Sequence, residues 1–415
     1  MTRFWQTCTI LTPASRGWLI AQQPRLREIA DGATSVRLRP AKRNNGFAST
    51  LPFRHHPAPT MFSMKIRQFI QTISAVLALA VAGPAAAKDS KTLDVYWVDV
   101  EGGGGTLIVT PAGESILIDT GMPGGRDPGR LHEAATQVAG VKQIDHLIIT
   151  HFHIDHFGGA AELSQKMPIK NVWDNGIPER DPDGRANSSF LLRIKPYRNM
   201  TVGKRHVIKP GTELPLKQVE DQPKIRIRCM AAMKKFLPVP DGTSRNPLTD
   251  KVKWIAEDTS DNANSVAVVV ELGDFRFWDG GDLTQNTEAR LVTPHNRVGT
   301  VDVYQVNHHG LDFSNNPIFV QSLAPTVSVM NNGVTKGCGA ASFAAVKSAR
   351  VGAMYQLHKN LRADVENNTA DEFIANLTRD CDAHHIHMSV APNGKKYTIS
   401  IPEKGHSRTY ETSRK

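Results

Sequence analysis

Short apolar stretches and segments of helical periodicity alternate along the chain from residue 93 onward. Turn residues separate many of them, such as Gly273-Asp274 and Pro392-Asn393-Gly394. This alternation, over a length that can bury a sizeable core, predicts a large α/β domain. The predicted strands are 93–100, 106–110, 115–119, 145–150, 169–173, 225–230, 265–272, 275–278, 301–306, 326–330, 388–391 and 397–401. The predicted helices are 131–138, 158–167, 284–291, 317–323, 340–348 and 371–377.

One predicted strand runs directly into a loop that is rich in metal-binding side chains. The apolar run Leu147-Ile148-Ile149 is followed by His151, His153, Asp155 and His156. In an extended segment the first two histidines alternate and can point the same way, whereas the last two residues turn toward a second position. Two imidazoles suit a zinc-like ion, and a carboxylate with an imidazole suits a neighbouring ion. The pattern favours a metal site over a histidine-rich surface loop without metal.

Later strands end in further candidate ligands. Asp282 follows a predicted hairpin, where its carboxylate can either bridge two cations ~3.5–4 Å apart or cap the helix that comes next. His308 and His309 follow the predicted strand 301–306 and precede a glycine. His206 lies just before another apolar stretch and is a weaker candidate ligand.

The segment His151–His156 resembles the metal-binding motif of the metallo-β-lactamase superfamily. Within it, the chain looks closest to secreted relatives of the hydrolase domain of bacterial DNA-uptake competence proteins. The resemblance extends from Leu93 to Tyr410 and implies a four-layer αββα sandwich, with residues 88–415 as a single domain. The turn Ile118-Asp119-Thr120-Gly121 is similar to the superfamily's first motif, whose Asp braces the metal loop without binding metal.

The resemblance also implies a ligand set for two ions. Its members are His151, His153, Asp155, His156, Asp282 and His309, with His308 as the alternative to His309. The superfamily's order implies that Asp282 bridges the ions and that His309 completes the second site. Asn175 stands where many relatives have a histidine, so the first ion lacks an imidazole unless His206 supplies it.

The implied activity is metal-dependent hydrolysis. Two divalent ions, expected to be zinc with manganese or iron as alternatives, would lower the pKa of a shared water from ~15.7 toward ~7. Asp155 and Asp282 are the catalytic candidates. The competence-type resemblance implies phosphoester substrates, and two alternatives remain: a lactone or β-lactam hydrolase, and a non-catalytic module that binds a single ion. Two long polar segments, 178–196 and 238–257, are predicted loops that would wall the substrate site.

The net charge and the apolar pattern of the N-terminal residues bear on the predicted partners and location of the protein. The formal charge of +10 falls to about +1 once residues 1–87 are excluded, so the charge does not support a nucleic-acid partner. Residues 64–87 read as a signal peptide, with a basic start, an apolar centre and an Ala85-Ala86-Ala87 cleavage site. Residues 1–63 are a doubtful leader, and translation is expected to begin at Met61 or Met64. We therefore expect a secreted or periplasmic protein without stable membrane insertion. The sequence indicates no oligomeric state.

Export into an oxidising compartment makes a disulfide plausible, and Cys338 with Cys381 is the predicted pair. Cys229 lies in a predicted strand and is expected to be a buried thiol. His358 follows a short apolar run, and a substrate contact and a structural role are equally compatible with that position.

Overall fold

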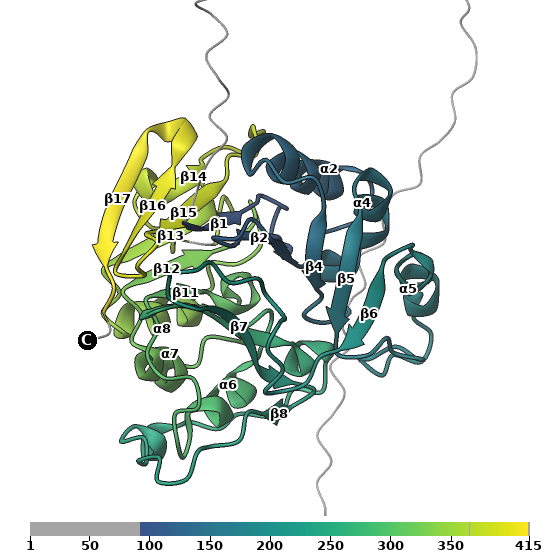
Figure 1. Ribbon diagram of the computed structural model, residues 1–415. Helices are drawn as coiled ribbons and strands as arrows, with labels where there is room; N and C mark the ends of the chain where they lie inside the picture. Colours follow the sequence, from purple (N-terminus) through teal and green to yellow (C-terminus); the bar gives the residue numbers. More distant parts are fainter. Residues whose placement is uncertain (1–91, 365, 414–415) are drawn as a thin grey trace, which may run out of the picture. The chain divides into compact units, whose positions relative to one another are not determined.

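The computed structural model describes residues 92–364 and 366–413 (Figure 1). These residues lie within one compact unit, Pro84–Lys415. The predicted leader, 1–63, and the predicted signal peptide, 64–87, lie outside the described residues. Within the described part of the chain, no helix has the length and apolar character needed to cross a membrane.

The first of two large sheets contains nine strands. Strands β3 to β6 pair in parallel, and the remaining neighbours are antiparallel. In spatial order the strands are β17 (His406–Glu411), β16 (Lys396–Ile401), β15 (Ile386–Val390), β1 (Leu93–Trp97), β2 (Thr106–Val109), β3 (Ser115–Ile118), β4 (Ile144–Ile148), β5 (Ile169–Asp174) and β6 (Lys204–Val207).

The second sheet contains eight strands. Its strands β10 to β14 are parallel, whereas β10, β9, β7 and β8 pair antiparallel. In spatial order the strands are β14 (Ile374–Asn376), β13 (Ala353–His358), β12 (Val327–Met330), β11 (Val303–Gln305), β10 (Phe275–Asp279), β9 (Ala267–Leu272), β7 (Ile225–Ala232) and β8 (Lys235–Phe236).

Helices lie on the outer side of each sheet (Figure 1). On the first sheet they are α2 (Arg126–Glu133), which continues into a π turn at Ala134–Val138, α3 (Ile154–Phe157), α4 (Ala160–Lys166) and α5 (Phe190–Asn199). On the second sheet they are α6 (Gln285–Val292), α7 (Pro317–Leu323) and α8 (Ala340–Ser348). Single 3₁₀ turns occur at Thr249–Lys251, Asp261–Asn264, Asn307–Gly310, Asp371–Phe373 and Pro402–Lys404.

Three buried clusters correspond to the three interfaces between these layers. Strand β1 shows why, because Val95 and Trp97 belong to the cluster between the sheets while Tyr96 belongs to the cluster under α2, α4 and α5. A strand covered on both faces is apolar throughout, as β1 and β4 largely are. Leu291 and Phe319 belong to the third cluster, under α6 and α7. The predicted mixed α/β sandwich is confirmed.

The prediction of a helix over 371–377 was wrong. A 3₁₀ turn, Asp371–Phe373, leads directly into the edge strand β14. Ile374 pairs with Gln356 of β13, and the Asn376 side chain donates a hydrogen bond to the Leu357 carbonyl. Pairing with a sheet edge has overridden the local helical pattern, as tertiary context often does.

The predicted loop 178–196 is also only partly a loop, because its last residues begin α5. Helix α5 buries Phe190, Ile194 and Tyr197 and carries Pro196 in its interior. The burial of one apolar face therefore maintains a helix that the internal proline disfavours. The other long segment, 238–257, contains one 3₁₀ turn and is otherwise irregular, as predicted.

The predicted Cys338–Cys381 disulfide is wrong, because Cys229, Cys338 and Cys381 are all free thiols. The Cys338 sulfur contacts the sulfur of buried Met330, whereas the Cys381 thiol points at the Asp99 carboxylate. Cys229 is fully buried in β7, as expected.

Candidate metal centre

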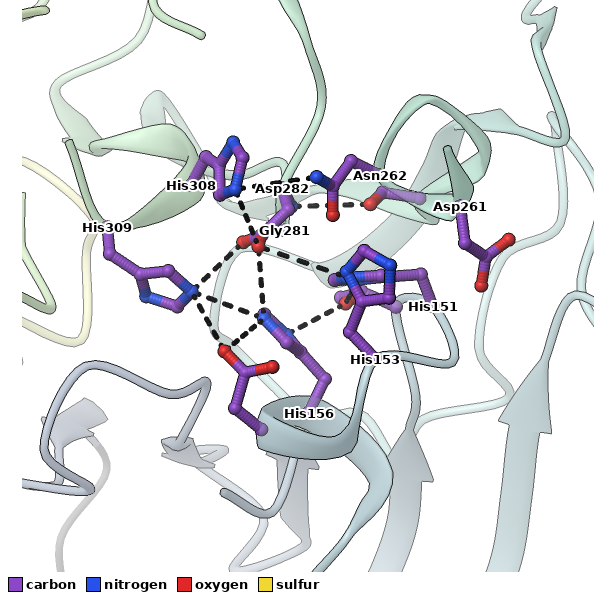
Figure 2. A network of polar contacts seen from close by, with 12 residues as sticks. His151, His153, His156, Asp261, Asn262, Gly281, Asp282, His308 and His309 are labelled. Atoms are coloured by element: carbon purple, nitrogen blue, oxygen red, sulfur yellow. Dashed lines mark hydrogen bonds and ion pairs between the residues drawn. The ribbon is translucent and has the colours of Figure 1, made fainter. Parts of the chain in front are cut away.

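The site lies where several parallel strands end. The metal loop leaves the end of β4 and continues into α3, Asp282 follows β10, and His308 and His309 follow β11. Strand β4 belongs to the first sheet, whereas β10 and β11 are parallel neighbours in the second, so the site combines strand ends from both sheets. Figure 2 shows His151, His156, His308 and His309 directed toward Asp282.

The Asp282 carboxylate is the centre of this arrangement. Its oxygens lie 3.2 Å from His156 Nε2, 3.3 Å from His309 Nε2, 3.5 Å from His308 Nε2 and 3.9 Å from His151 Nε2. Helix α6 is N-capped by Thr284, so Asp282 lies outside the cap position. Asp282 therefore does not N-cap α6, and its carboxylate lies among the four imidazoles.

Two groups of possible ligands overlap in space. One group is His151, His156 and Asp282, and the other is Asp155, His156 and His309; within each group the ligand atoms lie within 4.8 Å of one another. His156 Nε2 is 3.6 Å from Asp155 Oδ2 and 3.2 Å from His309 Nε2. His156 is common to both groups, whereas the sequence pattern placed it with one ion only.

The chemistry of this donor set fits divalent transition metals. Imidazole nitrogens and carboxylate oxygens are the ligands that zinc, manganese and iron accept. The Nε2 atom of His151 is buried and has no hydrogen-bond partner, which is costly unless a ligand satisfies it. Its Nδ1 atom faces Thr150 Oγ1 at 3.1 Å, so the unsatisfied nitrogen is the one nearer Asp282.

Burial and neighbouring charges shift the pKa values of these groups in different directions. Burial lowers the pKa of His151 well below its ordinary value. For His156 burial acts in the same direction, but the carboxylates of Asp282, Asp119 and Asp155 outweigh it and hold the pKa well above that value. Burial opposes ionisation of Asp282 too, yet the surrounding imidazoles, His156 first, hold its pKa well below the usual range. The site is built to keep Asp282 anionic.

A second layer of contacts fixes the ligands. Asp119 Oδ2 lies 2.7 Å from His156 Nδ1 and accepts a hydrogen bond from Thr150 Oγ1. Asp119 thus braces the metal loop from β3, in the position that its motif implied, and such partners orient metal-binding imidazoles. The Gly104 backbone packs against this brace, since a Cβ there would lie 2.6 Å from Asp119 Oδ2. This close approach explains a glycine at that position of the Gly102–Gly105 run.

The backbone is strained at the end of β11. His308 and His309 have φ values of 53° and 55°, in the left-handed region that residues other than glycine rarely adopt. His309 Nδ1 faces the Asn331 carbonyl at 3.3 Å, and His308 Nδ1 faces Ser314 Oγ at 3.1 Å. Strain of about 1–3 kcal/mol per residue persists where a site needs the resulting side-chain directions.

Several sequence-predicted candidates lie apart from the two groups. His153 Nε2 faces the Asp183 carboxylate at 3.0 Å, although its ring still contacts that of His151. Asn175 donates a hydrogen bond to the Asn264 carbonyl, and His206 stacks on Trp173. Neither Asn175 nor His206 contacts the clustered ligands in any described interaction, so the structure gives neither of them a place among the candidate ligands.

Sequence reasoning missed two charged neighbours of the site. Lys336 forms an ion pair with Asp155 Oδ2, and Asp183 takes His153 as a partner. Both lie on irregular segments far along the chain from the metal loop, and neither carries a motif. A cavity of about 500 Å³ opens beside His153 and Asp155, and Arg185 and Arg193 are among its lining residues.

His358 belongs to a neighbouring polar cluster with Asp99, Glu101 and Cys381, in which four possible ligand atoms lie within 4.8 Å of one another. His358 is fully buried, and its Nε2 atom lies 2.7 Å from Asp99 Oδ1. Arg130 and the Cys381 thiol both donate to the other oxygen of Asp99. Arg130 balances the charge of Asp99, whereas His358 Nδ1 is buried without a hydrogen-bond partner.

Asp279 makes the metal-free protein's stability pH-dependent. Burial raises its pKa to about 7, against the opposing hydrogen bond from the Gly281 N–H. The folded state then retains a proton that the unfolded state has released, so the free energy of unfolding falls as pH rises from about 4 to about 7. Asp279→Asn should remove this pH-dependent loss, so its free energy of unfolding should exceed that of the parent protein by about 1–3 kcal/mol between pH 5 and 8.

Urea unfolding of metal-free samples across that pH range measures the effect. Asp274→Asn, at an exposed turn, is the matched control and should leave the curve unchanged. Parallel curves for Asp279→Asn and the parent would contradict the assignment of this proton to Asp279.

Comparisons with known proteins place part of the chain in relation to a known family. Residues 101–222 match the family model of the Metallo-beta-lactamase superfamily, a range that contains the metal loop and ends before Asp282. A UPF0173 metal-dependent hydrolase of Polynucleobacter asymbioticus is 27% identical over 240 residues, which span 56% of this chain and 73% of that protein.

Two solved structures are also similar to the chain. CmlA, a diiron β-hydroxylase from Streptomyces venezuelae, is 14% identical with a TM-score of 0.36, over 64% of this chain and 52% of that one, about half its length. A metallo-β-lactamase mutant from Cronobacter sakazakii is 18% identical with a TM-score of 0.30, over 51% of this chain and 75% of that one. The finer resemblance to competence proteins stays a prediction. The fold is a two-sheet α/β sandwich, and the family match over residues 101–222 together with the hydrolase relative supports a metal-dependent hydrolase.

Proposed function

We propose that this protein is a hydrolase that uses two divalent metal ions, and that its substrates are phosphoesters. The observation that carries the proposal is the position of the Asp282 carboxylate. One of its oxygens lies 3.3 Å from His309 Nε2, and the other lies 3.2 Å from His156 Nε2 and 3.9 Å from His151 Nε2. An anionic carboxylate between two imidazole-containing groups is the arrangement that two neighbouring cations require. Zinc is the expected metal, with manganese or iron as alternatives.

Each clustered residue has a role in this proposal. His151, His156 and Asp282 would hold one ion, while Asp155, His156 and His309 would hold the other. Bound ions of this kind lower the pKa of a coordinated water toward ~7 and act as Lewis acids. Asp119 keeps the His156 ring oriented, and Asp155 and Asp282 supply the negative charge that retains the cations. Asp155 lines the cavity where a substrate would enter, whereas Asp282 is buried.

Cationic side chains near the site support an anionic substrate. Arg185 and Arg193 line the cavity next to His153, and Lys336 lies against Asp155. Arginine forks and lysine ammonium groups are suited to phosphate oxygens. Arg185 also pairs with Asp183 at 2.7 Å, and Asp155 and Asp181 line the same cavity. Arg193 is therefore the cation that most favours a phosphoester over a neutral lactone.

A chromogenic substrate panel tests the proposal. With added zinc or manganese, the protein should hydrolyse bis(p-nitrophenyl) phosphate faster than a p-nitrophenyl carboxylic ester, a lactone or a chromogenic cephalosporin. Turnover of the lactone or cephalosporin without turnover of any phosphoester would replace the phosphoester proposal with the second enzyme class. Metal binding without turnover of any of them would favour the single-ion binding module.

We also propose that the protein is exported, on the strength of the signal-like pattern in residues 64–87. N-terminal sequencing of protein from the native host should find a mature chain that begins near Lys88. Recovery of a chain that retains residues 1–60 would contradict export by this signal.

A further inference from the structure

A second cavity, of about 480 Å³, adjoins the metal centre on the side of His308. His308 and Asn262 form its inner wall, and Asn262 Nδ2 lies 3.4 Å from His308 Nε2 (Figure 2). His308 Nε2 is in turn 3.5 Å from Asp282 Oδ2. A group held in this cavity therefore lies one side chain away from the reacting centre.

The outer rim of this cavity is apolar, in contrast to the arginine-lined cavity beside His153. Ile255 and Phe313 line it and remain 50% and 70% exposed. Trp254, next to Ile255 in the chain, is 55% exposed. Exposed large apolar side chains that gather around a concavity beside a reaction site mark a binding surface for apolar groups. We refer to the cavity lined by Ile255, Phe313, Asn262 and His308 as the apolar pocket.

Both rims of the apolar pocket are fixed to helix α6. The buried Asn286 side chain accepts a hydrogen bond from the Ile255 N–H and donates one to the Ile255 carbonyl, at 3.1 and 2.8 Å. On the other rim, the Gln285 N–H donates to the Phe313 carbonyl at 3.0 Å, and Gln285 Nε2 donates to the Asp312 carbonyl at 2.7 Å. The segment around Ile255 is anchored again by the ion pair of Glu257 with Arg290.

Such anchoring gives the pocket its shape before a ligand arrives. When an apolar group enters a preformed cavity, its transfer from water makes binding more favourable, and no free energy is spent on ordering the two loops. The Arg290 guanidinium lies over the Trp254 ring, 5.8 Å from its centre, whereas Ile255 and Phe313 keep much of their apolar surface exposed. These exposed surfaces are best explained by an occupant that covers them during binding.

We propose that the substrate carries an apolar alkyl, acyl or aryl substituent next to the bond that is cleaved, and that this substituent occupies the apolar pocket. This inference rests on the proposed function for the position of the cleaved bond. The polar part of the substrate then faces the metal ligands and the arginine-lined cavity. Substrate selectivity follows from the length of the substituent, because each buried methylene adds a favourable increment until the cavity is full.

Two chain-length series test the inference and separate it from the phosphoester proposal. The first is methyl to hexyl p-nitrophenyl phosphate, in which water forms the new P–O bond and p-nitrophenolate leaves. We expect kcat/KM to rise about two- to fourfold per methylene over the shorter chains. The second is the matching series of alkylphosphonates, which have no cleavable ester, titrated calorimetrically into the metal-loaded protein. Their Kd should fall with chain length in the same way.

Phe313→Ser and Ile255→Ser should flatten both series, so that kcat/KM and Kd no longer change with chain length. Leu192→Ser is the matched control, because Leu192 is 76% exposed on α5 and does not line the apolar pocket. A chain-length gradient in phosphonate binding without turnover of the phosphodiesters would retain the pocket and overturn the phosphoester proposal. Turnover without any gradient, or a gradient that survives both serine substitutions, would overturn the assignment of the pocket.

Discussion

Asp282→Asn should abolish turnover while the fold is retained. Asn has the shape of Asp, and the main-chain N–H of residue 282 would still donate to Ser265 Oγ. It lacks the charge that faces the imidazoles of His156, His309, His308 and His151. Two cations close together need an anionic bridge, so we expect both ions to bind more weakly. We expect kcat/KM to fall by about 10³-fold or more, because the activated water is lost.

Circular dichroism, metal analysis and kinetics on the same preparation check each part of this result. Asp274→Asn, which removes one exposed carboxylate of the same type, is the control and should retain metal and activity. If Asp282 served mainly as a helix cap, its substitution by Asn would be mild, because Asn caps about as well as Asp. An Asp282→Asn protein with two ions and full activity would remove Asp282 from the site.

His309→Ala should have a large effect that His308→Ala does not share. His309 Nε2 lies 3.3 Å from Asp282 and 3.7 Å from Asp155, so it faces both carboxylates. His308 approaches Asp282 only, at 3.5 Å, and its ring lines the apolar pocket. We expect His309→Ala to lose one ion and most of the activity, by about 10²-fold or more. His308→Ala should retain two ions.

The two alanine variants are mutual controls, because His308 and His309 lie side by side in the 3₁₀ turn Asn307–Gly310 and both have left-handed backbone angles. Metal analysis after gel filtration, followed by kinetics at saturating metal, separates lost binding from lost catalysis. Loss of an ion in His308→Ala but not in His309→Ala would reverse the assignment of the last ligand.

The local chemistry and the order of the elements were readable from the sequence. The apolar run before His151 marked it as a strand-end residue, and the family resemblance implied the same for Asp282 and His309; the structure places His151 after β4 of the first sheet and the other two after β10 and β11 of the second. Asp119 was also expected to act as a brace, and its hydrogen bonds to the metal loop have that form. Periodicity and strand ends are local signals, so one sequence is enough to reveal them.

What escaped prediction depends on contacts between distant segments. The partner of His153 is Asp183, on an irregular segment, and Asp155 meets Lys336 from beyond β12. Nothing in the spacing of these residues indicates that they meet. The strand β14 likewise depends on the free edge of β13, which a helical pattern in 371–377 does not reveal. The wrong disulfide prediction has the same cause. An oxidising compartment allows thiols to pair, but it does not indicate which thiols lie close enough to do so.

Metal content per chain tests the central claim most directly. Protein that has been loaded with zinc or manganese, freed of excess by gel filtration and analysed by inductively coupled plasma mass spectrometry should contain two ions per chain. The Asp282→Asn protein, treated in parallel, should contain fewer than one. Two ions in the parent that fall together in the variant are the result that a bridging Asp282 predicts. One ion in the parent, or none, would contradict the dinuclear centre, and one would support the single-ion module.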